Sequence, residues 1–192
     1  MSYCRFANAL PPGSTDPNKH YHDHEYGFPL EDDNALFGRL LLEINQAGLS
    51  WTLMLKKQEN FRASYSGFDI AAVAAYDDSD RARLLADTGI VRNRLKINAA
   101  IHNAQQILRL QHEYGSFKAW LDAQHPLLLP QWLKAFKKQQ FKFIGGEIIG
   151  EFLMSCGYLP GAHSADCPMY PRILAANPPW LVATQEYGHI HR

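Results

Sequence analysis

Apolar residues recur at helical spacing through most of this chain, and no segment shows the sustained alternation of a half-buried β-strand. In the segment 36–44, for example, Leu36, Leu40 and Ile44 fall on one face of a helix. Residues that favour helix N-termini, such as Asp69 and Ser116, precede several of these segments. We therefore predict an all-α fold, with helices around 36–44, 70–76, 80–88, 97–114, 117–121, 130–139 and 147–156.

The two ends of the chain lack this periodicity. The first 30 residues and the stretch after Gly157 are rich in Pro, Gly and His, and such ends fray unless something holds them. The length of 192 residues suits one domain, so we expect a single domain over 1–192, organised as two helical lobes with a pocket between them. Residues 168–192 would form a C-terminal tail.

Composition excludes several classes of protein. Hydrophobic residues make up 46% and charged residues 20%, which is typical of a soluble globular protein, and the apolar runs are too short to cross a bilayer. The first residues lack a secretory signal, so we expect a cytoplasmic protein. In that reducing compartment three cysteines favour metal binding or simple burial over disulfides.

Local charge carries more information than the formal net charge of +0. The segments 89–112 and 131–146 each contain four Lys or Arg residues and no acidic residue. Two basic helix faces can bind a phosphate backbone, but on charge alone solvated helix faces are the better interpretation.

Two cysteines and two histidines at the ends of the chain have the chemistry of a structural zinc site. His163 and Cys167 stand four residues apart, while Cys4 and His22 lie in the irregular N-terminal segment. An ion bound by all four would hold the two ends together. From spacing alone, ordinary His and buried Cys residues are the commoner explanation. The histidines of 20–24 also resemble a metallo-β-lactamase signature, but that fold is rich in strands and the pattern is one residue short.

The segment 42–51 is the best candidate for a ligand site. Glu43 falls at the edge of the apolar face, where a carboxylate must be paired or held for function. The helix is predicted to break at Gly48, which is followed by Leu49 and, after Ser50, by Trp51. The Trp and the acid suit a base pocket, and the Leu could fill the gap that an extruded base leaves. A core helix–turn–helix would have the same pattern.

The segment 141–154 has the outline of a helix-hairpin-helix, with a basic helix, a short turn containing Gly145 and a second helix. Such turns present backbone N–H groups that bind phosphate, and Lys142 would add a cation. An ordinary αα-hairpin looks the same.

Together these motifs resemble the 3-methyladenine DNA glycosylase I family over nearly the whole stretch from Cys4 to Cys167. The specific matches are Tyr21–Gly27, Leu42–Glu43 with Gln46–Trp51, Gly89–Arg94 and Phe141–Gly145. The resemblance implies a monofunctional, monomeric enzyme that flips 3-methyladenine out of double-stranded DNA and hydrolyses its N-glycosidic bond, with no protein partner implied.

The resemblance also implies residue roles. Glu43 would contact the flipped base, Trp51 would stack on it and Tyr21 would line its pocket, while Leu49, Lys142 and Gly145 would contact DNA. One structural zinc would be held by Cys4, His22, His163 and Cys167. The family lacks the catalytic Asp of many helix-hairpin-helix glycosylases, and Asp166 is interpreted as a loop residue.

The chain departs from the family pattern around the pocket. Asn18 stands where a Tyr is common, and Phe6 and Tyr26 stand where the family has Trp. These departures put the substrate range and the rate in question and leave two hypotheses. The first is an active glycosylase, which the retention of Glu43 and Trp51 favours, and the second is a lesion-binding protein of the same fold that turns over slowly.

Overall fold

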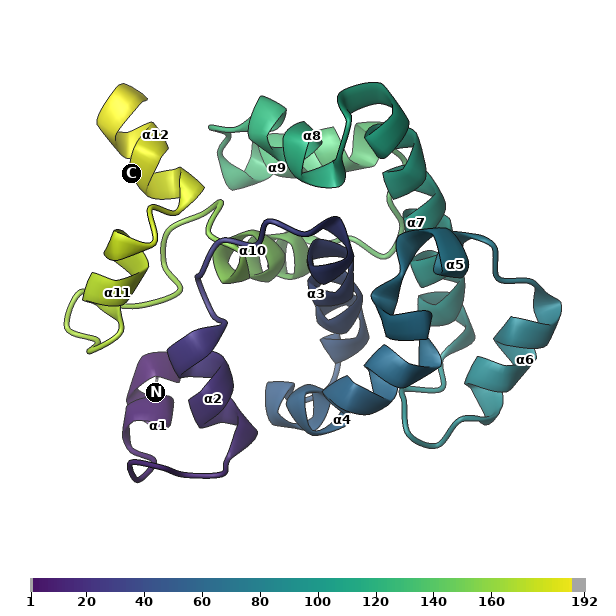
Figure 1. Ribbon diagram of the computed structural model, residues 1–192, viewed down its shortest axis with the longest axis horizontal. Coiled ribbons are helices and arrows are strands. Elements are labelled where there is room, and N and C mark those ends of the chain that lie inside the picture. The colour runs from purple at the N-terminus through teal and green to yellow at the C-terminus, as the bar shows by residue number, and fades with distance from the viewer. Residues whose placement is uncertain (1, 188–192) are drawn as a thin grey trace.

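The computed structural model describes residues 2–187, and every regular element in that range is a helix (Figure 1). This confirms the all-α prediction. None of these helices is both long enough and apolar enough to cross a membrane. The α-helices are α1 (Tyr3–Asn8), α2 (Pro17–His24), α3 (Asp33–Gln46), α4 (Trp51–Ser64), α5 (Ile70–Ala74), α6 (Asp78–Ala86), α7 (Arg94–Tyr114), α8 (Phe117–Gln124), α9 (Leu129–Lys138), α10 (Gly146–Ser155), α11 (Tyr170–Ala175) and α12 (Pro179–Tyr187), and the 3-10 helix η1 spans Ser66–Phe68.

Side chains cap many of these helices, which explains why their starting points were predictable. The Asp69 carboxylate accepts a hydrogen bond from an amide in the first turn of α5, and the Ser116 hydroxyl does the same for α8. Pro130 occupies the first turn of α9, where its missing N–H costs nothing. The expected helices therefore begin within a few residues of their observed positions.

The prediction of irregular ends is wrong for much of their length, because α1, α2, α11 and α12 lie there. Helices this short gain most of their stability from tertiary packing, which leaves little periodic signal in the sequence. In the tail, Ile173 and Ala183 are buried. Residues 188–192 of the expected tail lie outside the described part of the chain.

The core is built around α3, which packs against α4, α7, α8 and α10 (Figure 1). Apolar side chains from these helices, and from α9, form one large cluster. A smaller cluster contains Tyr21, Tyr26, Leu55 and Ala162, and Trp51 packs against both. The place where the two clusters meet is therefore formed by residues far apart in the sequence.

Candidate functional site

A cavity of about 730 Å³ opens where the two apolar clusters meet. Its volume falls in the range of small-molecule sites. The walls come from the aromatic residues of the N-terminal segment, the end of α3, the turn before α4 and the first turns of α10. The lining residues are Tyr3, Tyr21, Tyr26, Glu43, Gln46, Ala47, Gly48, Leu49, Trp51, Gly145, Gly146, Glu147, Ile148 and Glu151.

Glu43 is the buried acid of this cavity. Only 3% of the residue is exposed, yet its carboxylate makes no hydrogen bond to any other residue that the structure describes. Arg39, one helical turn earlier, donates its hydrogen bonds to Tyr21 (3.1 Å) and Glu25 (3.1 Å) instead. Burial raises the pKa of Glu43 to about 8; the positive charge of Arg39 opposes this rise and the negative charge of Glu151 adds to it. A buried carboxylate without a partner can receive a donor or a positive charge from a ligand.

Four aromatic rings stand around this carboxylate. The ring centroid of Tyr21 lies 5.0 Å from that of Trp51 and 5.6 Å from that of Tyr26, and Tyr26 lies 5.4 Å from Tyr3. Ring faces attract cations and stack on planar bases. The cavity therefore combines a carboxylate with π-faces, which is suited to a flat, positively charged ligand.

The turn between α3 and α4 brings Leu49 to the edge of the cavity. Gly48 has a φ of +84°, a backbone conformation that side-chain-bearing residues rarely adopt, so this turn needs glycine. Leu49 is 37% exposed, and its amide donates a hydrogen bond of 2.7 Å to the carbonyl of Gln46. An exposed Leu on a fixed turn at the edge of a cavity can insert into an apolar gap in a ligand that binds there.

The hairpin between α9 and α10 also contributes to the lining of the cavity. Gly145 lies at the N-cap position of α10, and no side chain caps that helix end, so its first amides are open to a ligand. Lys142 is exposed but does not line the cavity. Its amide donates to the Asn103 side chain (2.7 Å) and its carbonyl accepts from the same side chain (3.0 Å), so α7 holds the hairpin.

Asn18 and Phe6 do not line the cavity. Asn18 is 1% exposed, and its amide group donates to Asp16 (2.7 Å) and to Thr52 (3.0 Å). Tyr3 covers it and lines the cavity instead, donating a hydrogen bond of 3.2 Å to the Asn18 carbonyl. Phe6 is exposed and stacks on Tyr3, with 6.4 Å between ring centroids.

Two acidic lining residues are among those to which the sequence analysis gave no role. They are Glu147 and Glu151, which lie one turn apart on α10. Glu147 is exposed, whereas Glu151 is half-buried. Glu151 follows Gly150 and precedes the buried Phe152, so an acid next to an apolar helix face was the available signal. It is the same signal that drew attention to Glu43.

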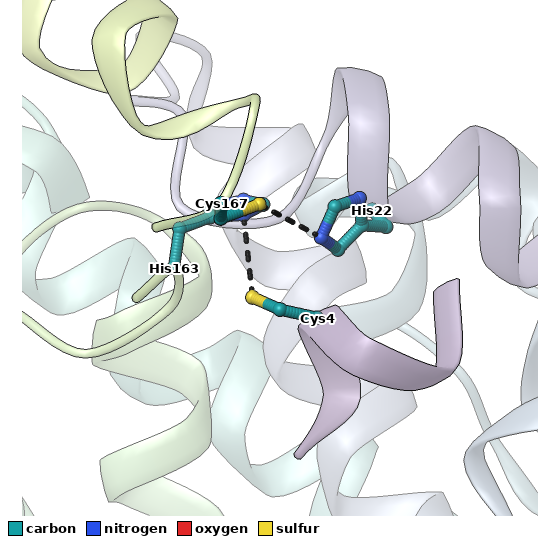
Figure 2. Close-up of side chains that lie close together, drawn as sticks. All are labelled: Cys4, His22, His163 and Cys167. Carbon is teal, nitrogen blue, oxygen red and sulfur yellow. Dashed lines mark hydrogen bonds between the residues drawn. The ribbon is translucent and has the colours of Figure 1, made fainter. Parts of the chain in front are cut away.

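Figure 2 shows Cys4, His22, His163 and Cys167 gathered from both ends of the chain. Their potential ligand atoms all lie within 4.8 Å of one another. All four residues are buried. The Cys167 sulfur lies 3.4 Å from His163 Nδ1 and 3.5 Å from His22 Nε2, and the Cys4 sulfur lies 3.7 Å from His163 Nδ1. In a tetrahedral zinc site a sulfur and a nitrogen ligand would be about 3.5 Å apart, so the arrangement fits one ion.

The second nitrogen of each histidine is also occupied. His163 Nε2 donates to the carbonyl of Tyr26 (2.8 Å), and His22 Nδ1 donates to the carboxylate of Asp23 (2.7 Å). Such bonds fix the ring so that the other nitrogen faces a metal. This cluster could hold a metal, and it uses His22 but neither His20 nor His24. Asp166 is exposed and does not line the cavity, as expected of a loop residue.

Comparison with known proteins agrees with this geometry. Residues 13–126 match the methyladenine glycosylase family. DNA-3-methyladenine glycosylase 1 of Escherichia coli is 38% identical in an alignment that covers 79% of this chain and 90% of that protein.

Two solved structures are similar over most of the chain. The 3-methyladenine DNA glycosylase I of Staphylococcus aureus superposes with a TM-score of 0.77 at 33% identity, covering 89% of this chain and 97% of the other. A variant of 3-methyladenine DNA glycosylase I in complex with 3-methyladenine gives a TM-score of 0.78 at 33% identity, covering 89% and 98% of the two chains.

Proposed function

This chain belongs to the methyladenine glycosylase family, and we propose that it hydrolyses the N-glycosidic bond of 3-methyladenine in alkylated double-stranded DNA. The observation that carries the proposal is the buried, unpartnered carboxylate of Glu43 facing an aromatic-walled cavity. A base that methylation has made cationic supplies the charge and the donor that this carboxylate lacks. The retained family activity is favoured over slow lesion binding because Glu43 and Trp51 both face the same cavity.

Recognition would begin when the damaged nucleotide flips out of the DNA double helix. Leu49 would fill the space that the base vacates, and the base would enter the cavity and stack on Trp51, with Tyr21 lining the wall beside it. Its exocyclic amine would donate to the Glu43 carboxylate, whereas the carbonyl oxygen of guanine at that position is itself an acceptor and could not make this hydrogen bond. The pocket thereby favours a methylated adenine.

The hydrolysis needs little acid catalysis from the protein, because a cationic base is already a good leaving group. The electron pair of the bond between the sugar C1′ and the base stays with the base and neutralises it, and water adds to C1′ with loss of a proton to solvent. No side chain becomes covalently attached to the sugar, so no lyase step follows. Glu43 acts by binding the cationic base and holding it in position while water attacks the sugar carbon.

The DNA backbone would be held from the side of the hairpin. The open amides at the start of α10, beside Gly145, suit a phosphate, and the exposed Lys142 adds positive charge next to them. These contacts do not read base sequence, as repair of a lesion in any context requires.

We also propose that the Cys4, His22, His163 and Cys167 cluster binds one structural zinc ion. The cluster offers four protein ligands and so leaves no position for a water or a substrate. When bound, the ion would contribute folding energy by joining the N-terminal segment to the segment after α10.

We further propose that the chain acts in the cytoplasm as a monomer, and that its single domain consists of two helical lobes with the pocket between them.

Release of free bases from methylated duplex DNA, resolved by base identity, tests the function. The wild type should release 3-methyladenine, Glu43→Gln should lose most of that activity, and Trp51→Ala should weaken binding of the flipped base by about 1–3 kcal/mol. Glu59→Gln, an exposed acid on α4, is the matched control and should keep full activity. Release of no methylated base by the folded wild type, or full activity in both pocket variants, would refute the assignment.

A further inference from the structure

A second carboxyl group lines the base cavity, and it comes from α10, which packs against α3. Glu151 lines the cavity with Glu43, although the two residues come from different helices. Glu151 is half-buried, and its carboxylate accepts a hydrogen bond of 3.1 Å from the hydroxyl of Tyr26. A tryptophan at position 26, the residue that the family pattern favours, has no hydroxyl to make this bond.

Tyr26 is held at both of its polar ends. Its carbonyl accepts the hydrogen bond from His163 of the Cys/His cluster, and its hydroxyl contacts Glu151 on α10. The Tyr26 ring also lines the cavity between Tyr21 and Tyr3. The bond therefore fixes the position of the Glu151 carboxylate relative to the aromatic wall.

The charged and titratable groups around Glu151 are mostly acidic. Glu147 lies one turn away and is exposed, Glu43 lines the same cavity, and Tyr26 donates its hydrogen bond to Glu151. Arg39 lies near Glu43 but bonds to Tyr21 and Glu25. Burial raises the pKa of Glu151, and the negative charge of Glu151 in turn contributes to the raised pKa of Glu43. Two carboxylates that share a low-dielectric site resist being ionised together unless a cation lies between them.

We propose that Glu151, positioned by Tyr26, is a second recognition carboxylate that makes the pocket select positively charged purines over neutral ones of the same shape. The proposal rests on the proposed function, since it concerns the same base pocket. Glu43 and Glu151 would both face a bound purine, and an N-alkylated cationic base would relieve the repulsion between their carboxylates. A neutral base of equal shape stacks equally well but gives no such relief.

A pair of probes with matched shape separates charge from shape. The 3,9-dimethyladeninium cation represents the methylated base as it occurs in DNA, and its 3-deaza analogue is neutral because carbon replaces N3. Binding of each to the purified full chain can be followed by quenching of tryptophan fluorescence. We expect Glu151→Gln to reduce the preference for the cation by about fivefold to tenfold, while affinity for the neutral probe changes by less than about twofold.

Two further variants define the role more closely. Tyr26→Phe should reduce the preference in the same direction but by less, because the carboxylate remains and only its positioning is lost. Glu147→Gln removes a carboxylate from the same helix at the exposed rim and should change the preference by less than about twofold. Equal effects of Glu147→Gln and Glu151→Gln would mean that only a general negative potential acts, and the inference would be wrong.

A pH profile gives a readout that a merely structural role would not change. Cation binding by the wild type should strengthen as pH rises and Glu43 ionises, and the midpoint should move to lower pH in Glu151→Gln because one like charge is gone. An unchanged preference and midpoint in a variant that folds normally would overturn the inference. Wild-type release of 3-methyladenine with no effect of Glu151→Gln would leave the proposed function intact, whereas failure of the wild type to release the base would contradict the function itself.

Discussion

The buried ammonium group of Lys96 donates a hydrogen bond of 2.7 Å to the backbone carbonyl of Ala47. A second bond of 2.8 Å reaches the carbonyl of Asn45, so the start of α7 caps the end of α3. Helix C-termini carry unpaired carbonyls and a partial negative charge, which a lysine satisfies well. The contact lies directly before the Gly48–Leu49 turn and thus supports both the turn and the adjacent pocket.

We predict that Lys96→Met weakens both folding and DNA repair. The two carbonyls would lose their buried donor, at a cost of about 1–3 kcal/mol in the free energy of unfolding, and the Leu49 turn would loosen. Denaturant unfolding and single-turnover base release measure the two effects. Lys57→Met is the matched control, since Lys57 also donates to two backbone carbonyls (Thr88, 3.1 Å, and Gly89, 3.0 Å) but does so away from the cavity. Equal losses in both variants would show that Lys96 has no special role at the turn.

The raised pKa of Glu43 predicts how stability depends on pH. Because the folded-state pKa of about 8 lies above the unfolded value near 4.5, the folded chain holds a proton that the unfolded chain has lost between these pH values. The free energy of unfolding should therefore fall as pH rises across this window. Comparing wild type with Glu43→Gln from pH 5.5 to 9 isolates the effect, since the variant lacks the titrating group. Parallel curves for the two proteins would mean that Glu43 titrates normally.

Metal content should depend on the four clustered residues and not on the third cysteine. Purified protein should contain about one zinc ion per chain, and Cys4→Ser or His163→Ala should lose it together with thermal stability. Cys156→Ala is the control, because this cysteine is buried in the core outside the cluster. Metal analysis and thermal unfolding with and without a chelator give both readouts. A full zinc complement in Cys4→Ser would contradict the ligand set.

Binding to undamaged duplex DNA should weaken steeply with salt. Lys142→Ala should lower the slope of log affinity against log salt by about one, as expected for one lost phosphate contact. Lys118→Ala provides a control, because Lys118 pairs with Asp122 at 2.8 Å and lies outside the hairpin. An unchanged slope for Lys142→Ala would indicate that the hairpin does not bind phosphate through this residue.

If Asn18 formed part of the cavity wall, replacing it with Tyr would be expected to speed base release. Because Asn18 is buried behind the wall, we expect the opposite effect. A Tyr there would restore a ring of the family pattern, but Tyr3 already covers this part of the wall and Asn18 is fully packed and hydrogen-bonded behind it. We expect Asn18→Tyr to destabilise folding by about 1–3 kcal/mol and to slow base release. Asn18→Ala removes the hydrogen bonds without adding volume and should be milder. Faster release by the Tyr variant in a single-turnover assay would refute this account.

Much of the architecture could be predicted from the sequence because it depends on local interactions. Helical periodicity and capping residues act over a few residues, so the segments around α3, α7 and α10 were recognisable. Glu43 was conspicuous because it stands at the edge of an apolar helical face. The chemistry of the four Cys and His residues suggested a possible metal site, but their spacing alone did not favour it, and the ligand set came from the family resemblance. The structure brings their potential ligand atoms to within 4.8 Å of one another.

Only the tertiary structure decided which side chains share the pocket. Tyr3 rather than Asn18 forms the wall because α1 packs over α2, and nothing in the spacing of the two residues indicates it. The same holds for Glu151 and Tyr26, which are 125 positions apart, and for Lys96 and Ala47, which are 49 apart. Periodicity reports which face of a helix is buried, but it does not report what that face meets. That choice is made when distant helices pack into one core, because the free energy of burial depends on the partner as well as on the residue.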